Sequence, residues 1–560
     1  MTIISSGQTQ VVSSGQTSNH TTLLWSGVQD VLKGGIARNT IVSSGGYQQV
    51  EGTAINTVIS LGGIEYLSGG VASGTIIRQG EQDVFKGGKA VRTVVSAGTQ
   101  DARSLLVVLG GGLAVSAKVG SGGEAYVTGT NAVASATMVA AGGYVEADNG
   151  GNLKGVTVMA GGELVLTSKA NATGVQLNGT EIVIGRTVGT KIANGGRETI
   201  SSGGVTSKTT IAGVNKGLFA ALGASEEVLD GGRAVGTVVS NGGGQIVDPG
   251  GTAINTVVLS GGTIELASGA VTSRIVLHSG ATEVLANGAS VSGFVVQKGI
   301  TLAVEHVPTG GGGFLPVASA TDCTVAAGGT LMNVGGIVTG LKILSGGEEV
   351  LIYGGVASGD TIGNGATMIT SSGGIAEDIT VKSGGTFVYG QAGSATNITV
   401  QSGGKEVVGT GAEVDGFTIG KGVTLTVQSG AAAGSPTING GTVIISSGAT
   451  LSGAAIFSGS GLLRLGGGKT LTAAVSGFAG GDTIDLSSMK FSATEKLKYV
   501  QNGTSGTLTI TDGTLKTTIT LFGQYVAGGF HMRADAGNGT AITYSSAGAE
   551  TSATIHGGHG

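Results

Sequence analysis

The sequence is poor in proline, cysteine, aromatic residues and charge. Its 560 residues include 4 prolines and 1 cysteine, Cys323, so an internal disulfide is excluded. Collagen is excluded as well, because it needs abundant proline with glycine at every third position. Aromatic residues make up 4% and charged residues 11%, while hydrophobic residues reach 40%. This balance argues against a disordered chain and against a broad core built on large rings.

The charges that are present form no block of one sign. The formal net charge is −5, and lysine and arginine form no basic stripe, so nucleic acid is not expected as a partner. Apolar runs such as Leu105 to Leu109 are far shorter than the roughly 20 residues of a membrane-spanning helix, so no transmembrane segment is expected. The stretch from Met1 to Gly7 has neither the basic nor the apolar region of a signal peptide.

Glycine is the residue that dominates, at 112 of 560, and it recurs with a short period. In the C-terminal half, units that begin at Ser345, Asn364, Ser383, Ser402 and Lys421 follow one another every 19 residues. Near the N-terminus, the turn glycines Gly27, Gly45, Gly62, Gly80 and Gly98 are 17 or 18 residues apart. Such a period is typical of a solenoid, in which each unit buries its apolar side only against its neighbours.

One unit, residues 61–78, shows the expected local structure. A glycine turn precedes the alternating run from Ile64 to Leu67, and a second turn at Gly69-Gly70 precedes Ala72 and Thr75-Ile76-Ile77. The same Ala and Thr, three residues apart, recur in other units as Ala37 and Thr40, Ala54 and Thr57, and Ala90 and Thr93. We therefore predict two short strands and two glycine turns per unit, stacked as an all-β, right-handed parallel β-helix of 18–19-residue turns.

The pattern predicts three parts of the chain. Residues 1–470 form the β-solenoid, with an irregular loop near 307–317 that holds two of the four prolines. Residues 471–545 form a β-rich cap, in which 507–511 and 516–521 make a hairpin around Asp512-Gly513. An end cap is expected because an exposed last turn is a template for unwanted strand pairing. Residues 546–560 form a flexible tail.

Few residues are candidates for chemistry, and no catalytic or cofactor-binding residue is predicted. Asp482 and Asp485 lie in a segment that partly matches a calcium-binding nonapeptide repeat, in a single imperfect copy, and a plain turn is the alternative interpretation. Thr40, Thr57, Thr75 and Thr93 are expected to stack into a ladder. That ladder is either an interaction surface or a row of strand-favouring residues whose hydroxyls link neighbouring turns.

Acidic residues also recur at related positions, among them Glu283, Glu348, Glu349 and Glu406. Enzymes with a β-helix fold gather acidic side chains on adjacent turns of one face to act on polysaccharides. We instead expect these four residues to lie on a solvated outer face, and we do not expect an enzyme.

The repeat S-G-x-x-x-V-x-x-G-G-x-A-x-x-T-x-V, as in residues 26–42, resembles the passenger repeats of AIDA-type self-associating autotransporters over about residues 5–470. The resemblance implies a right-handed β-helix on a bacterial surface that promotes autoaggregation, biofilm formation and adhesion. It also implies glycosylation of serine and threonine by a heptosyltransferase. This sequence differs in lacking the exporting signal peptide and the C-terminal translocator barrel, so we expect a passenger-like chain without the barrel.

These observations lead to one functional hypothesis and two alternatives. The hypothesis is a secreted or surface-bound bacterial adhesin or self-association protein, a rigid rod that binds other copies of itself or surface glycans through many weak polar contacts. The first alternative is a glycan-active lyase or hydrolase. The second is a passive scaffold or an ice-binding surface.

Overall fold

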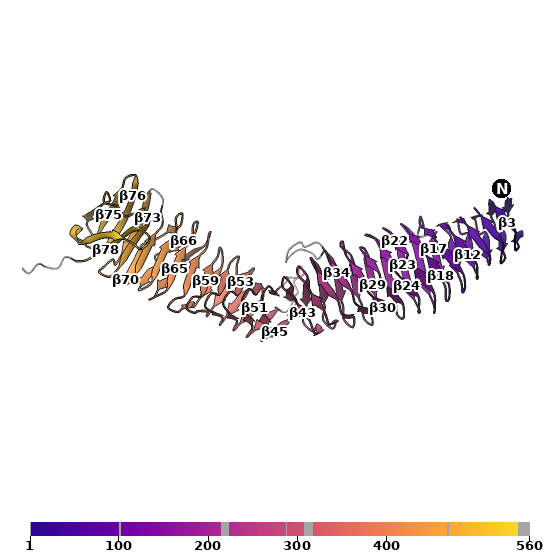
Figure 1. Ribbon diagram of the computed structural model, residues 1–560, viewed down its shortest axis with the longest axis horizontal. Helices are drawn as coiled ribbons and strands as arrows, with labels where there is room; N and C mark the ends of the chain where they lie inside the picture. Colours follow the sequence, from indigo (N-terminus) through magenta and orange to yellow (C-terminus); the bar gives the residue numbers. More distant parts are fainter. Residues whose placement is uncertain are drawn as a thin grey trace, which may run out of the picture. The chain divides into compact units, whose positions relative to one another are not determined.

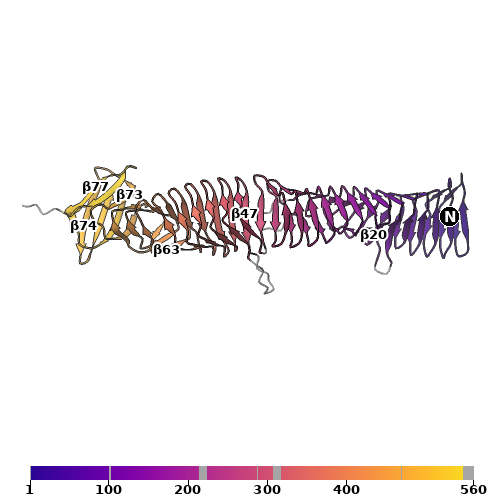
Figure 2. The same ribbon diagram turned by 90° about the horizontal axis from the view of Figure 1, so that it is seen from below.

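The computed structural model describes residues 2–99, 102–213, 223–286, 288–306, 317–467 and 470–546. Within these ranges the chain consists of short β-strands and one 3-10 turn, η1 (Ala527–Gly529), and none of its helices could cross a membrane. The chain divides into two compact units, Met1–Ala289 and Ser290–Gly560. In each unit short strands stack turn upon turn (Figures 1 and 2). The predicted all-β parallel solenoid is thereby confirmed.

Each regular turn of the coil contains three strands, not the two that we predicted. In one turn these are β11 (Ile64–Leu67), β12 (Val71–Ser73) and β13 (Ile76–Arg78). The stretch that we expected to hold one strand is divided at Gly74, which has φ of 72°, and the preceding turn has Asn56 at that position with φ of 57°. A left-handed residue cannot continue a strand, so the chain bends there and a third face begins.

In the first unit, every third strand pairs in parallel. One sheet of 15 strands runs from β1 (Thr2–Ile4) to β43 (Val276–Leu277), and one of 14 strands from β3 (Thr17–Asn19) to β42 (Val271–Ser273). A third series runs from β2 (Thr9–Val12) to β44 (Thr282–Leu285). The register places like residues in line, as with Ala54, Ala72 and Ala90. All three are at most 1% exposed, so small side chains form one column of the core.

The Gly-Gly turns combine two separate demands on the backbone. Gly69 has φ of 83°, a conformation that side chains disfavour. A Cβ on the next residue, Gly70, would collide with the carbonyl oxygen of Val50 in the preceding turn. The first glycine is therefore needed for the dihedral angle and the second for the close stacking of turns.

We expect Gly70→Ala to destabilise the first unit by roughly 1–3 kcal/mol, because the new methyl group must displace the backbone of the preceding turn. Thermal unfolding followed by circular dichroism measures the effect. Ser68→Ala, at an exposed position of the same turn, is the matched control and is expected to change stability little. Equal melting temperatures for both variants would contradict the steric argument.

The second unit has the same three-faced coil over most of its length. Its longest series runs from β47 (Thr301–Glu305) to β73 (Thr483–Lys490). Two six-stranded sheets run from β45 (Ser290–Ser292) to β60 (Ser394–Thr396) and from β46 (Val295–Val296) to β61 (Thr399–Val400). Beyond them, separate sheets begin at β63 (Glu413–Asp415) and β64 (Thr418–Ile419).

Among the described strands of this unit, antiparallel ladders lie near the C-terminal end, and an isolated antiparallel bridge joins Glu305 to Gly335. The predicted hairpin is present as β75 (Ser505–Asp512) and β76 (Leu515–Phe522), and β74 (Lys496–Asn502) extends it. β76 also pairs in parallel with β72 (Thr470–Ser476) of the coil.

On the other side of the coil's end, β78 (Gly539–Tyr544) pairs in antiparallel fashion with β73 and with β77 (Phe530–Ala534). A cluster of rings joins both groups of strands: Tyr499 comes from β74, Tyr525 from the segment after β76, Phe530 from β77 and Tyr544 from β78. We propose that residues 471–545 act as the end cap. The predicted loop at 307–317 falls almost wholly on 307–316, outside the described residues, as do residues 547–560 of the predicted tail.

Candidate functional surface and interior polar ladders

The four threonines of the predicted ladder lie inside the coil. Thr40, Thr57, Thr75 and Thr93 are each at most 1% exposed. The hydroxyl of Thr40 donates to Oε1 of Gln29 (3.1 Å), and that of Thr57 donates to Oε1 of Gln48 (3.0 Å). The interaction-surface interpretation is therefore wrong for these residues, because a partner outside the coil cannot reach them. The alternative was that their hydroxyls link neighbouring turns. The bonds of Thr40 and Thr57 stay within one turn, whereas the hydroxyl of Thr75 accepts a hydrogen bond from the amide of Gln82 in the following turn (3.1 Å).

The partners of these threonines form an interior ladder that the sequence analysis missed. Gln10, Gln29, Gln48, Glu65 and Gln82 occupy the same register position on successive turns. The amide of Gln29 donates to Gln10 (2.6 Å), that of Gln48 donates to Gln29 (2.7 Å), and that of Gln82 donates to Glu65 (2.5 Å). Buried polar groups require such partners, and here each turn supplies them to the next. The signal was available, because Gln10, Gln29 and Gln48 are 19 residues apart.

A second ladder in the first unit is rich in carboxyl groups. Glu181, Glu198, Glu226 and Gln245 are aligned on four successive turns, and each is fully buried. Glu226 accepts hydrogen bonds from Thr206 (2.9 Å), Thr237 (2.9 Å) and Gln245 (2.6 Å). Thr209 donates to one oxygen of Glu198 (3.3 Å). Among the described residues, no donor reaches the other oxygen of Glu198 or either oxygen of Glu181.

The missing donors are explained if these carboxyl groups keep their protons. Burial raises the pKa of Glu198, and the neighbouring carboxylates of Glu181 and Glu226 raise it further. Burial likewise raises the pKa of Glu181. A protonated carboxyl group can donate to the next carboxyl along the ladder, which satisfies both. In the same series of strands, burial raises the pKa of Glu283 to about 7.

The raised pKa values predict that the first unit is most stable in mild acid. A carboxyl whose pKa is higher in the folded than in the unfolded state contributes its full stability below the unfolded value of about 4.5. That stability is lost as the pH rises through the folded pKa, which is about 7 for Glu283. The melting temperature is therefore expected to fall between pH 5 and pH 8.

Glu198→Gln should reduce this fall and stabilise the protein at pH 8, because an amide can donate to Glu226 as Gln245 does. Glu163→Gln, at a half-buried outer position, is the control. Melting curves of the three proteins at pH 5 and pH 8 test this. A wild-type melting temperature that rises towards pH 8, or an equal fall in all three proteins, would refute the argument.

The recurring acidic residues do not lie on an outer face as expected. Glu283, Glu349 and Glu406 are 8%, 0% and 5% exposed and lie inside the coil. Only Glu348 faces outward, because side chains alternate along a strand and Glu349 is the next residue. The signal for burial was their position two residues from an inward aliphatic side chain, as with Glu349 and Leu351.

The two residues of the calcium prediction also make internal contacts. Asp482 accepts hydrogen bonds from the backbone N–H groups of Ala479 (2.7 Å) and Gly461 (3.2 Å). Asp485 accepts one from Nε of Arg464 (2.7 Å). Across the described ranges, no group of three or more histidine, cysteine or acidic side chains is placed to hold a metal ion. The arrangement is that of a turn beside a strand, and calcium binding stays a prediction.

An outward-facing row of threonines lies on the second unit, away from the predicted positions. Thr330, Thr367, Thr386, Thr424 and Thr442 share one register position, interrupted by Glu348 and Lys405. Two residues further along the same strands is an outward aliphatic row, made of Met332, Val350, Ile369, Val388 and Val407. All ten residues of these two rows are half-buried. We call them together the threonine face.

The threonine face is carried by β50 (Thr330–Val334), β53 (Glu348–Ile352), β56 (Thr367–Thr370), β59 (Thr386–Tyr389), β62 (Lys405–Val408), β65 (Thr424–Val427) and β68 (Thr442–Ile445). Each is the longest strand of its turn except β68, which is shorter than β70 (Ala455–Gly459). Their parallel pairing repeats the side chains about every 4.8 Å. The neighbouring series from β46 to β61 has two-residue strands, each with a single outward position. The threonine face is therefore the wider of the two.

Comparisons with known proteins give similarities to solved structures. The sequence matches no family model and no curated protein. Among solved structures, it is similar to the TibC-catalysed hyper-glycosylated TibA fragment, with 29% identity over 51% of this chain and 95% of that fragment, at a TM-score of 0.42. A Siphovirus 9NA tailspike receptor-binding domain aligns at 10% identity over 85% of this chain and 84% of its own, at a TM-score of 0.12. Neither superposition is used to assign a role to a residue of this chain.

Proposed function

We propose that this protein is an extracellular bacterial adhesin of the self-associating kind and that its second unit binds other copies through the threonine face. The observation that carries the proposal is the outward alignment of Thr330, Thr367, Thr386, Thr424 and Thr442 beside an aliphatic row. Two such faces can exchange hydroxyl hydrogen bonds and bury apolar surface at the same time. Each hydrogen bond contributes only about 0.5–1.5 kcal/mol, but a repeated row adds them together.

The proposal includes location and modification. A chain that joins cells must lie on the cell surface or be secreted, and we propose that location here. Threonine and serine hydroxyls on outer positions are acceptors for a heptosyltransferase, which the AIDA-type resemblance implies as a partner. Surface glycans are the second class of partner. The buried position of Glu283, Glu349 and Glu406 supports an adhesin over a glycan-active enzyme, because an external polymer does not reach them.

The test changes the charge of the threonine face. The triple variant Thr367→Lys, Thr386→Lys and Thr424→Lys places three like charges on each face, so two faces should repel each other. We expect concentration-dependent association of the wild type in sedimentation velocity, and clumping of coated beads, with both abolished in the triple variant at low salt. The effect should weaken at high salt, because exposed charges are screened.

The matched control carries the same three substitutions on the neighbouring face, at Thr324, Thr361 and Thr380, which are aligned in the two-residue strands. This control should associate like the wild type. Equal loss in both triple variants would point to charge in general and not to the threonine face. A wild type that stays monomeric at all concentrations would refute the proposed self-association.

A further inference from the structure

The stacking of the second unit is interrupted on two of its three faces at one step. β60 does not pair with β63, nor β61 with β64, although β59, β62 and β65 stay paired in one series across the same step. One turn earlier, the N–H of Asp378 donates to the carbonyl of Thr396 (3.2 Å), and that of Thr399 donates to Ile379 (2.8 Å). Within residues 317–467, no corresponding bonds join Asn397 to Asp415 or Thr418 to Ile398.

Large side chains inside the coil account for this opening. Tyr389 and Phe417 occupy interior positions that hold Val408 and Ile398 in neighbouring turns. Their rings meet edge to face with centroids 5.0 Å apart, and Phe387 packs on Tyr389 at 4.7 Å. The chain length cannot be the cause, because Ser394 and Glu413 keep the 19-residue spacing. Three rings in a core built for aliphatic side chains force the turns apart on the side that they fill.

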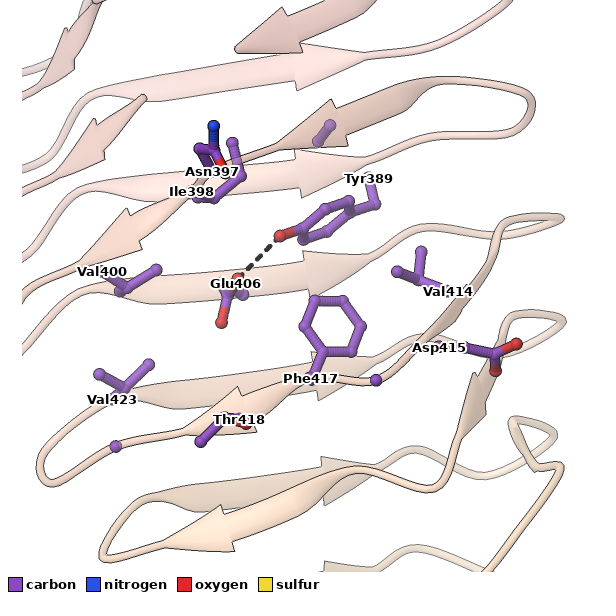
Figure 3. Close-up of a pocket in the computed structure, with 13 residues that line it drawn as sticks. Tyr389, Asn397, Ile398, Val400, Glu406, Val414, Asp415, Phe417, Thr418 and Val423 are labelled. Atoms are coloured by element: carbon purple, nitrogen blue, oxygen red, sulfur yellow. Dashed lines mark hydrogen bonds between the residues drawn. The ribbon is translucent and has the colours of Figure 1, made fainter. Parts of the chain in front are cut away.

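The opening contains a cavity of about 460 Å³ between the two separated turns. Figure 3 shows Tyr389, Glu406 and Phe417 in the middle of the view, with Ile398 and Val400 of the earlier turn to the left and Val414 and Asp415 of the later turn to the right. Tyr389 donates a hydrogen bond to Glu406 (2.8 Å), and burial raises the pKa of that carboxyl. A Cβ added to Gly420, which also lines the cavity, would meet no atom within 4 Å.

The cavity exposes apolar surface that is covered elsewhere. Ala376, Ile379 and Val381 are each 0% exposed. Their equivalents one turn later, Ala395, Ile398 and Val400, are only half-buried. The opening thus offers two strand edges that face each other across an apolar interior. Unpaired backbone groups on such edges are a template for another strand.

We propose that this opening is a binding site for an extended polypeptide segment of another protein, which would enter between the separated turns as an added strand. The segment would pair with the edges of β60–β61 and β63–β64 and place alternate apolar side chains among Ala395, Ile398 and Val400. The lining residues include the acids Glu406 and Asp415 but no lysine, arginine or histidine, so the segment should carry a basic side chain. This inference does not depend on the proposed self-association.

A peptide with the sequence of residues 335–345 has the required features. In the folded chain its residues Val338, Leu341 and Ile343 are inward and 0% exposed, and Lys342 is outward and exposed. The fluorescein-labelled peptide should bind the full chain saturably in anisotropy, measured below the concentration at which the protein associates with itself. Hydrogen exchange should show new protection at the N–H groups of Asn397 and Thr418.

Gly420→Phe should fill the opening and weaken peptide binding at least tenfold. The control is Gly528→Phe, at another glycine whose added Cβ meets no atom within 4 Å, and it should bind like the wild type. A peptide with lysine in place of both Val338 and Ile343 should also bind at least tenfold more weakly. Circular dichroism shows whether each variant keeps its fold.

Three outcomes would overturn the proposal: no saturable binding to the wild type, equal binding to the wild type and Gly420→Phe, or equal binding of both peptides. Displacement of the peptide by neutral hexose oligosaccharides would reassign the opening to a carbohydrate. The two sites are separate if the threonine-face variant loses bead clumping but still binds the peptide. They are likewise separate if Gly420→Phe loses peptide binding but still supports clumping.

Discussion

The structure depends on parallel stacking in register, in which each turn shields the interior of its neighbours. Ala54, Ala72 and Ala90 illustrate the constraint, because they are aligned on successive turns and all three are buried. No turn could be stable alone, since a three-strand coil has too little interior of its own. The same constraint explains the second glycine of the Gly-Gly turns, where any side chain would separate neighbouring turns.

Stacking also decides which polar residues the interior can accept. A lone buried glutamine would cost free energy, but a glutamine with another on the next turn has a donor and an acceptor in reach. Gln29 and Gln48 satisfy this rule, whereas Glu181 and Glu198 satisfy it only with protons retained. Glu349 and Asp360 form a similar pair in the second unit, where burial raises the pKa of both. Polar and apolar side chains can therefore both occupy the core without breaking the fold.

The repeat was enough to predict the fold class, because Ala and Thr keep their spacing from unit to unit. It did not show the third strand of each turn, because left-handed conformation at Asn56 or Gly74 leaves no mark in a hydrophobic pattern. The inward orientation of Glu349 and Glu406 could have been deduced from the alternation of side chains along a strand. Their charge suggested instead that they face the solvent. The opening beside Phe417 was beyond sequence reasoning, since the 19-residue period runs through it unchanged and only ring volume separates the turns.

The glutamine ladder has one further consequence. In each bond described between neighbouring rungs of the first unit, the amide of the later turn donates to the earlier one: Gln29 to Gln10, Gln48 to Gln29, Gln82 to Glu65 and Gln245 to Glu226. Side-chain dipoles that point the same way add together and polarise one another. These side-chain amides therefore give the interior of this unit a dipole along its axis. An α-helix has such a dipole too, but there it comes from backbone amides.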